Sequence, residues 1–236
     1  MTGRRALGFA IVAACLAPAA WVAWQALFGD LGANPIETVT HVTGEWGLRL
    51  LLASLAVTPL RRLAGWHLIA TQRRTLGLFA FAYVAAHFFI WSVLDNGLDL
   101  ASIAEDIGKR PFVTLGFAAF VLLIPLAATS TRASIRRLGK RWIRLHQLVY
   151  VAATLGVLHF FWLVKKDLRP PLVYAAVLVL LLGMRIWWRY SKSRSSTVRR
   201  PSARAFSIAR SQSPRTASDK GATTRSDVLK PERPRT

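Results

Sequence analysis

Long apolar stretches alternate with short polar segments along most of the chain. Six stretches are about 20 residues long and span roughly 6–28, 44–60, 75–94, 111–129, 142–164 and 171–189. A helix of that length crosses a hydrocarbon core of about 30 Å, because each helical residue rises about 1.5 Å. The pattern therefore predicts an all-α integral membrane protein, a bundle of six transmembrane helices. No internal repeat stands out.

Local signals place several helix ends and one further helix. Thr43 is suited to cap the second stretch, Pro111 to begin the fourth and Pro170 to begin the sixth. Between the third and fourth stretches, apolar and acidic residues alternate at helical spacing from Leu98 to Ile107. We expect this segment to form a short amphipathic helix on the outer membrane surface.

The basic residues are unevenly divided between the two sides of the predicted bundle. With the N-terminus inside, 26 of the 32 Lys and Arg fall on the cytoplasmic side and five on the outer side, while Arg49 lies within the second stretch. Lys and Arg near helix ends are retained in the cytoplasm. Both termini are therefore expected to be cytoplasmic.

The C-terminal segment differs in composition from the rest. Residues 191–236 hold 12 Lys and Arg, three Asp and Glu, and few aliphatic side chains. Such a segment cannot bury enough surface to offset its chain entropy. We expect a disordered basic cytoplasmic tail attracted to anionic lipid headgroups, and a dedicated partner-binding arm is the alternative.

The N-terminal stretch has two interpretations. Its basic start and small residues resemble a signal peptide, and the segment from Val12 to Cys15 loosely resembles a lipoprotein cleavage box. However, apolar residues continue from Trp21 to Phe28 and complete a membrane span. We therefore expect an uncut helix in which Cys15 is an unmodified, lipid-embedded thiol.

Composition narrows the function classes. The formal net charge is +21, but 53% of residues are hydrophobic and the mean hydropathy is +0.34, so the lipid bilayer and not nucleic acid is the expected partner of the charge. One cysteine excludes an intrachain disulfide and a thiolate metal cluster. No Gly-rich phosphate loop, paired catalytic carboxylates or Ser/His/Asp arrangement is visible, so no nicotinamide site or hydrolytic centre is recognisable.

Two histidines from different stretches are predicted at similar depth. His87 and His159 both lie in the outer half, near the outer ends of the third and fifth stretches. Facing neutral imidazoles suit the axial positions of a haem iron, whereas zinc or copper is expected to recruit further ligands. Neighbouring aromatic residues such as Phe88 and Phe160 suit a porphyrin face or contact lipid. We predict a shared haem; hydrogen bonds to neighbouring helices are the alternative.

His146 is predicted near the cytoplasmic surface. It precedes His159 by thirteen residues, which is about 20 Å of helix and a rotation of about 140°. No transmembrane histidine opposes it, but Arg73 or Arg74 lies at the matching depth and His67 in the adjacent loop. We expect His146 to serve a second, cytoplasmic-side haem or its environment.

Arg49 and His41 are weaker candidates on the outer side. Arg49 follows Glu45 by four residues, so it either forms a local ion pair or faces a haem propionate. His41 is expected to be a solvated surface residue.

Blocks of sequence distributed over residues 34–190 carry a family resemblance. They are Asn34–Glu37, Thr43–Trp46, Leu55–Arg62, Arg73–Leu78, Tyr83–His87, Lys109–Pro111, Leu126–Ser130, Trp142–Tyr150 and Leu158–Val164. In combination they resemble the MsrQ (formerly YedZ) haem-binding membrane subunits of the ferric-reductase-like transmembrane group. The resemblance implies a ferric-reductase-like haem-binding bundle over 34–190, after an N-terminal helix and outer loop over 1–33 and before the tail over 191–236.

The resemblance also implies cofactors and partners. Its matching histidines are His87, His146 and His159, and it implies b-type haem with FMN as an additional cofactor. It implies a bacterial inner-membrane protein that takes electrons from quinones and delivers them to MsrP, a periplasmic molybdopterin-containing reductase that repairs methionine sulfoxide in envelope proteins. Substrate turnover then belongs to the partner, and this chain transfers electrons.

Two other functions remain open at this point. A haem-dependent ferric or cupric reductase subunit would share the electron path and differ in its acceptor. A non-haem transporter or structural subunit would use the histidines for protons, a free metal or helix contacts. Related NADPH oxidases and ferric reductases carry a flavin and nicotinamide domain after the sixth helix, for which residues 191–236 are too few and too polar.

Overall fold

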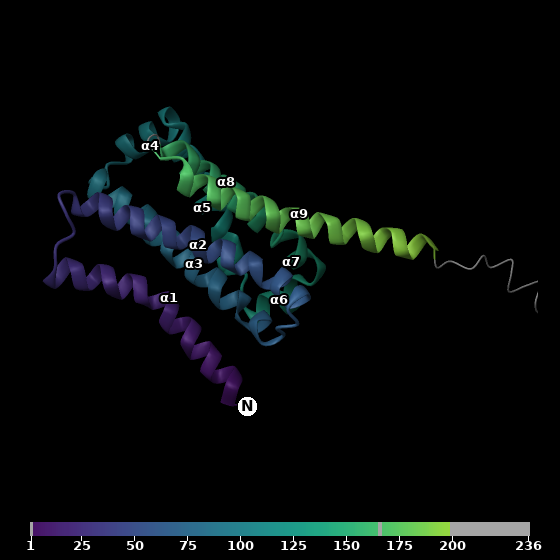
Figure 1. Ribbon diagram of the computed structural model, residues 1–236. Coiled ribbons are helices and arrows are strands. Elements are labelled where there is room, and N and C mark those ends of the chain that lie inside the picture. Colours follow the sequence, from purple (N-terminus) through teal and green to yellow (C-terminus); the bar gives the residue numbers. More distant parts are fainter. Residues whose placement is uncertain (1, 165–166, 199–236) are drawn as a thin grey trace, which may run out of the picture. The chain divides into compact units, whose positions relative to one another are not determined.

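The computed structural model describes residues 2–164 and 167–198, and in them every regular element is a helix. The chain divides into two units, Met1–Tyr190 and Ser191–Thr236. The elements are α1 (Thr2–Phe28), α2 (Pro35–Leu63), the 3-10 helix η1 (Leu68–Gln72), α3 (Arg73–Ile90), the π-helical turn η2 (Trp91–Asp95), α4 (Leu100–Lys109), α5 (Pro111–Ala128), α6 (Arg132–Leu138), α7 (Lys140–Leu145), α8 (Leu148–Leu163) and α9 (Arg169–Val198) (Figure 1).

The predicted all-α membrane class is confirmed. Five segments are long and apolar enough to cross a membrane, and they are Gly3–Phe28, Leu68–Asp95, Pro111–Ala128, Lys140–Leu163 and Arg169–Ser191. The second predicted span corresponds to α2, which carries Glu45 and Arg49 within its apolar part and is therefore more polar. It buries more residues than any other described helix, so its environment is mostly protein.

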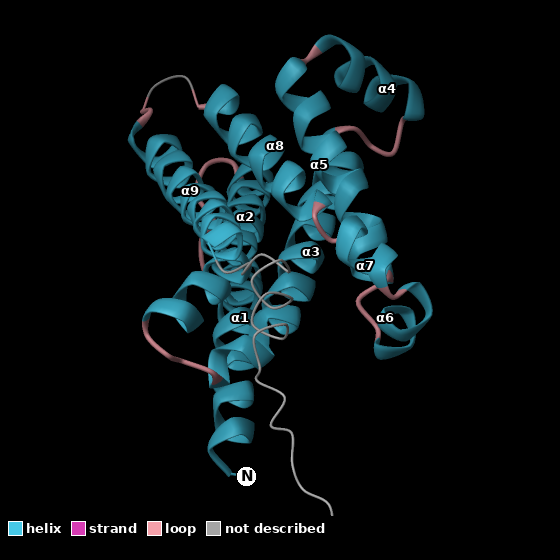
Figure 2. Cartoon of the chain, turned by 90° about the vertical axis from the view of Figure 1, so that its right-hand side faces the viewer, coloured by secondary structure: helices cyan, strands magenta, loops and turns pink. Residues whose placement is uncertain are grey.

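Two helix pairs form the core of the first unit (Figure 2). α2 packs along α3 and α5 packs along α8, while α3 also contacts α5 and α2 contacts α8. Leu55, Ala80 and Ala152 are fully buried where these helices meet, and the small alanines allow close approach of the backbones. Large apolar side chains such as Trp162 and Val179 are 59% and 70% exposed, as expected for a surface that faces lipid.

α1 bends near its middle (Figure 1), and Tyr83 of α3 contacts its backbone there. Pro18 cannot donate a helical hydrogen bond. Nearby, the Tyr83 hydroxyl donates to the Cys15 carbonyl at 2.8 Å and accepts from the Ala19 amide at 3.0 Å. These two backbone groups would pair directly in a straight helix, so the hydroxyl bridges the bend and attaches α1 to α3.

The expectation of a lipid-embedded Cys15 is wrong. Its side chain is only 2% exposed and belongs to the protein core. α1 is apolar on all sides, so the sequence alone did not show which face packs against the bundle.

α2 begins earlier than the apolar pattern predicts. Pro35 occupies its first turn, and the Asn34 side chain caps it by accepting the Glu37 amide at 3.3 Å. Thr43, the expected cap, lies about two turns inside the helix, where its hydroxyl donates to carbonyls of the preceding turn. The polar first turns extend the helix beyond its apolar part. Pro111 and Pro170 lie in the first turns of α5 and α9, as predicted.

The short amphipathic helix predicted after the third span is α4, which packs against α5. Asp99 caps it and accepts hydrogen bonds from the Ser102 hydroxyl at 2.6 Å and from the Ala101 amide at 3.1 Å. Hydrogen bonds from the Ser102 hydroxyl and from the Ala101 and Ser102 amides hold the pKa of the Asp99 carboxyl below its usual value. Ile103 and Ile107 are half-buried on the side that contacts the bundle.

α9 continues beyond the expected start of the disordered tail, to Val198. Extending an existing helix costs less than nucleating a new one, which is a physical reason for this difference. The remainder of the predicted tail, residues 199–236, lies outside the described residues.

Candidate functional site

A cavity of about 420 Å³ lies among α2, α3, α5 and α8 and is lined by both His87 and His159. Its volume is in the range of small-molecule and cofactor sites. Most of its lining is apolar or aromatic and includes Leu48, Val84, Phe88, Phe117, Phe120 and Phe160. The cavity is at the end of the bundle that also holds Glu37, Asp95 and Asp106, which we call the acidic end.

His87 is oriented by the backbone of the neighbouring helix. Its Nδ1 lies 2.8 Å from the Thr40 carbonyl oxygen of α2. A carbonyl only accepts, so Nδ1 carries a proton, and in the neutral imidazole Nε2 then keeps its lone pair. Gly44 makes this approach possible, because a Cβ atom there would lie 2.9 Å from Nδ1.

His159 has the same arrangement on the other helix pair. Its Nδ1 donates to the Phe112 carbonyl oxygen of α5 at 2.6 Å, and a Cβ atom at Gly116 would lie 2.8 Å from it. The two imidazole centroids are 6.1 Å apart, with an interplanar angle of 76°. Two neutral imidazoles with unprotonated Nε2 atoms therefore line one cavity, one from each pair of helices.

The two arrangements belong to an internal repeat, contrary to our expectation that no repeat stands out. The first set is Thr40, Gly44 and His87. The second set lies 72 residues later at each position and is Phe112, Gly116 and His159. His-Phe-Phe occurs at 87–89 and again at 159–161, and the fully buried Ala80 and Ala152 also correspond. The α2–α3 and α5–α8 pairs are thus parallel repeats. Few other positions match, and the repeated tripeptide was the signal in the sequence.

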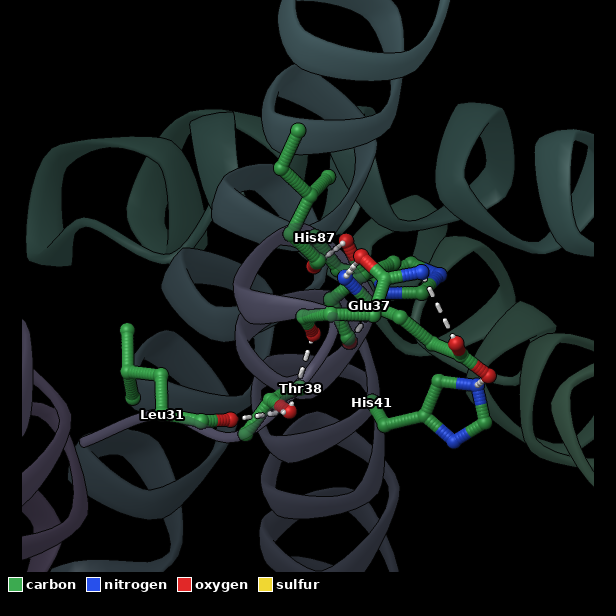
Figure 3. Close-up of polar contacts among 8 residues, drawn as sticks. Leu31, Glu37, Thr38, His41 and His87 are labelled. Atoms are coloured by element: carbon green, nitrogen blue, oxygen red, sulfur yellow. Dashed lines mark hydrogen bonds and ion pairs between the residues drawn. The ribbon is translucent and has the colours of Figure 1, made fainter.

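The mouth of the cavity is polar. Figure 3 shows Glu37 and His41 near His87. His41 Nε2 is 3.9 Å from Glu37 Oε1, and the His41 side chain is 47% exposed. Arg110 also lines the cavity and pairs through Nε with Asp106 Oδ1 at 3.1 Å. His41 is therefore a rim residue, and Arg110 is a site residue that the sequence analysis missed because nothing distinguished it from other loop cations.

Arg49 is not among the residues that line the cavity. It forms an ion pair with Glu45, and its Nε donates to the Tyr174 hydroxyl of α9 at 2.8 Å. Its guanidinium carbon lies 5.0 Å from the centroid of the Trp46 ring. These contacts correspond to the local ion pair that the sequence offered as one of two interpretations.

His146 has different hydrogen bonds. Its Nε2 is 3.2 Å from the Thr129 hydroxyl, which itself donates to the Pro125 carbonyl at 2.6 Å. Because that hydroxyl has one proton, it accepts from His146, so Nε2 carries a proton. The Trp142 ring stacks on the imidazole at 4.0 Å and donates its Nε1 hydrogen to the Thr129 carbonyl.

The structure brings one of the predicted arginines near His146. Arg73 is close enough to interact electrostatically with it, and both Arg73 and Arg74 have exposed side chains. His67 lies at the start of η1. The rotation expected for a continuous helix does not apply, because the chain turns at His146 between α7 and α8.

Comparison with known proteins gives consistent matches. Residues 43–157 match the family described as ferric reductase like transmembrane component. The "protein-methionine-sulfoxide reductase heme-binding subunit MsrQ" of Ralstonia nicotianae is 55% identical over 170 residues, which cover 71% of this chain and 78% of the relative. Its counterpart in Rhodospirillum rubrum is 54% identical over 178 residues, 75% of this chain and 86% of the relative. The counterpart in Caulobacter vibrioides is 51% identical over 185 residues, which cover 78% of this chain and 88% of the relative. No solved structure matches significantly.

Proposed function

The chain belongs to the MsrQ family of ferric-reductase-like membrane proteins, and we propose that it transfers electrons across a membrane through b-type haem. The relatives are named as heme-binding subunits of a protein-methionine-sulfoxide reductase. The observation that carries the proposal is the cavity shared by His87 and His159, each with its Nδ1 hydrogen bonded to a backbone carbonyl.

The residues present fit a haem. Histidines that bind metal commonly donate their second ring nitrogen to a carbonyl, which fixes the tautomer and the ring orientation. The imidazole centroids are 6.1 Å apart, a separation at which one metal ion between the rings could be reached by both Nε2 atoms at about 2.0 Å each. Among the described residues no group of three or more His, Cys, Asp or Glu could hold a bare metal ion, which disfavours zinc at this position.

Each part of the site has a separate task in this proposal. Bound haem would supply a one-electron carrier. His87 and His159 would hold it through their Nε2 atoms, and the aromatic lining would exclude water from the cavity. Arg110, which lines the cavity, would supply a positive charge near the acidic groups of the haem. His146 would serve a second cofactor toward the opposite end.

The charges suggest the orientation of the protein in the membrane, and the family suggests the direction of electron transfer. We propose a bacterial inner-membrane protein with both termini cytoplasmic, so that the acidic end faces the periplasm. Electrons would enter from membrane quinones and leave to MsrP, the periplasmic molybdopterin-containing partner that carries out turnover of methionine sulfoxide. FMN is a further cofactor that this family membership suggests. Support for the proposed membrane orientation is the 26 Lys and Arg assigned to one side.

A reduced-minus-oxidised absorption spectrum tests the proposal. The purified, folded protein from cells supplied with haem should show a low-spin b-type signal. In proteoliposomes, a quinol should reduce the haem that gives this signal, and a soluble acceptor on the acidic side should reoxidise the haem. A folded, cofactor-replete preparation without a low-spin signal would exclude electron transfer through haem and favour a transporter or structural role. Efficient reduction of ferric ions without any partner would favour a metal reductase.

A further inference from the structure

The charges of the bundle are separated by end. All Asp and Glu residues in the described part of the chain lie at or near the acidic end, namely Asp30, Glu37, Glu45, Asp95, Asp99, Glu105, Asp106 and Asp167. The four ion pairs found among the described residues lie there as well. The opposite end, which we call the basic end, gathers Arg62, Arg73 and Arg185 without a described carboxylate beside them.

The described hydrogen-bond partners of Arg185 in α9 are neutral groups. Pro59 has no amide hydrogen, so the Leu55 carbonyl lacks its helical donor, and Arg185 Nη2 donates to it at 2.7 Å. Nη1 donates to the Tyr150 hydroxyl, and the guanidinium carbon lies 4.9 Å from the centroid of that ring. Within the described residues, Nε is buried and has no hydrogen-bond partner.

Two further cations act on this guanidinium. Arg62, near the end of α2, and Arg73, at the start of α3, both interact electrostatically with Arg185. The Arg62 guanidinium lies 4.8 Å from the centroid of the Trp188 ring, one turn along α9 from Arg185. Like charges repel, and a partly buried cation is unfavourable unless an anion accompanies it. Among the residues that the structure describes, the cluster therefore has no counter-ion.

We propose that Arg62, Arg73 and Arg185 bind the phosphate of an anionic phospholipid. Guanidinium groups match phosphate oxygens through paired hydrogen bonds, and basic pockets between membrane helices bind anionic headgroups. Arg185 lies six residues before the end of the apolar segment Arg169–Ser191, about 9 Å of helix, which is within reach of the headgroups.

The test is lipid retention by the full-length protein. The protein would be delipidated in detergent, incubated with phosphatidylglycerol or phosphatidylcholine, and analysed by native mass spectrometry. One phosphatidylglycerol should remain bound per chain, and phosphatidylcholine should be lost. Arg62→Gln and Arg73→Gln should each reduce retention several-fold. Arg137→Gln on α6 removes the same charge from this end outside the cluster, and it should retain the lipid.

Arg185→Gln is the less decisive variant, because this side chain also holds the Leu55 carbonyl. Arg62→Gln leaves that hydrogen bond in place and keeps the haem spectrum as an independent check of folding. Equal retention of the two lipids, or full retention in Arg62→Gln, would overturn the proposal. Competition by millimolar inorganic phosphate that releases the lipid completely would assign the site to soluble phosphate and overturn the lipid assignment.

Discussion

His159 lies near the end of α8 and His146 just before its start, and the two differ in which ring nitrogen donates a hydrogen bond. His159, like His87, donates Nδ1 to a backbone carbonyl and keeps a lone pair on Nε2. His146 donates Nε2 to the Thr129 hydroxyl and is stacked by Trp142. A histidine within a membrane helix is therefore prepared for metal binding by its second hydrogen bond, and its depth alone does not show this.

The largest effect is expected when an axial nitrogen is removed from the cavity. His87→Ala and His159→Ala should each lower haem content roughly tenfold or more, since loss of even a supporting hydrogen-bond partner commonly costs 10–100-fold in affinity. Haem content and electron flow from quinol to acceptor would be measured in membranes with equal amounts of folded protein. His41→Ala, at the rim, serves as the control and should keep most of the haem. Unchanged haem content and reduction kinetics in both variants would contradict the proposed pairing.

The supporting glycines give the next largest effect. Gly116→Ala and Gly44→Ala place a Cβ atom 2.8 and 2.9 Å from the Nδ1 atoms, so each imidazole must leave its carbonyl. Haem retention should fall roughly tenfold, as for other lost supporting contacts. Alanine favours a helix over glycine by about 1 kcal/mol, so the loss should occur without a lower thermal midpoint of the apoprotein.

Gly77→Ala in α3 is the matched control for these variants, because nothing lies within 4 Å of the added Cβ atom. It should bind haem like the unchanged protein. Equal haem loss in Gly77→Ala and Gly116→Ala would mean that general helix packing, and not the orientation of the imidazole, accounts for the effect.

His146→Ala should have a smaller effect on total haem. The cavity around His87 and His159 does not include His146, so the outer spectral component should persist. A separate component, or the rate of reduction by quinol, should decline instead. Resolved redox titration monitored by absorbance would separate the two components. Loss of the outer component in His146→Ala would show that the two ends are not independent.

The smallest effect concerns cations at the cavity mouth. Arg110→Gln removes a positive charge that lines the cavity, and the reduction potential of the outer haem should fall by roughly tens of millivolts, because a nearby cation stabilises the reduced state. Arg49 does not line the cavity and its charge is paired with Glu45, so Arg49→Gln should shift the potential less. A larger shift of the potential in Arg49→Gln than in Arg110→Gln would instead indicate that Arg49 is the cation that acts on the haem.

The sequence predicted the elements whose signals are local. Apolar length predicted the class and most of the spans, and Pro111 and Pro170 marked two helix starts. The early start of α2 was missed because its first turns are polar and only the Asn34 cap signals them. The turn at His146 was missed because residues 140–163 have an apolar pattern that does not distinguish one helix from two.

The candidate site was partly predictable for the same reason. Depth selected His87 and His159 correctly as neighbours, since each lies a few residues from the end of its helix. Their hydrogen-bond acceptors are 47 residues away in the chain and depend on which helices pack together. The roles of Gly44 and Gly116 follow from the same packing, as do the places of Arg110 on the cavity and Arg49 outside it.

The repeat also has a consequence for biosynthesis. The α2–α3 hairpin emerges from the ribosome with half of the site, and the second half is absent until His159 has been made, 72 residues later. At roughly 5–20 residues per second, this interval lasts roughly 4–14 s. During it, the Thr40 carbonyl can already fix the imidazole of His87, so one binding half is preformed before its counterpart is inserted. Stable capture of the cofactor would then be timed by translation of the second hairpin.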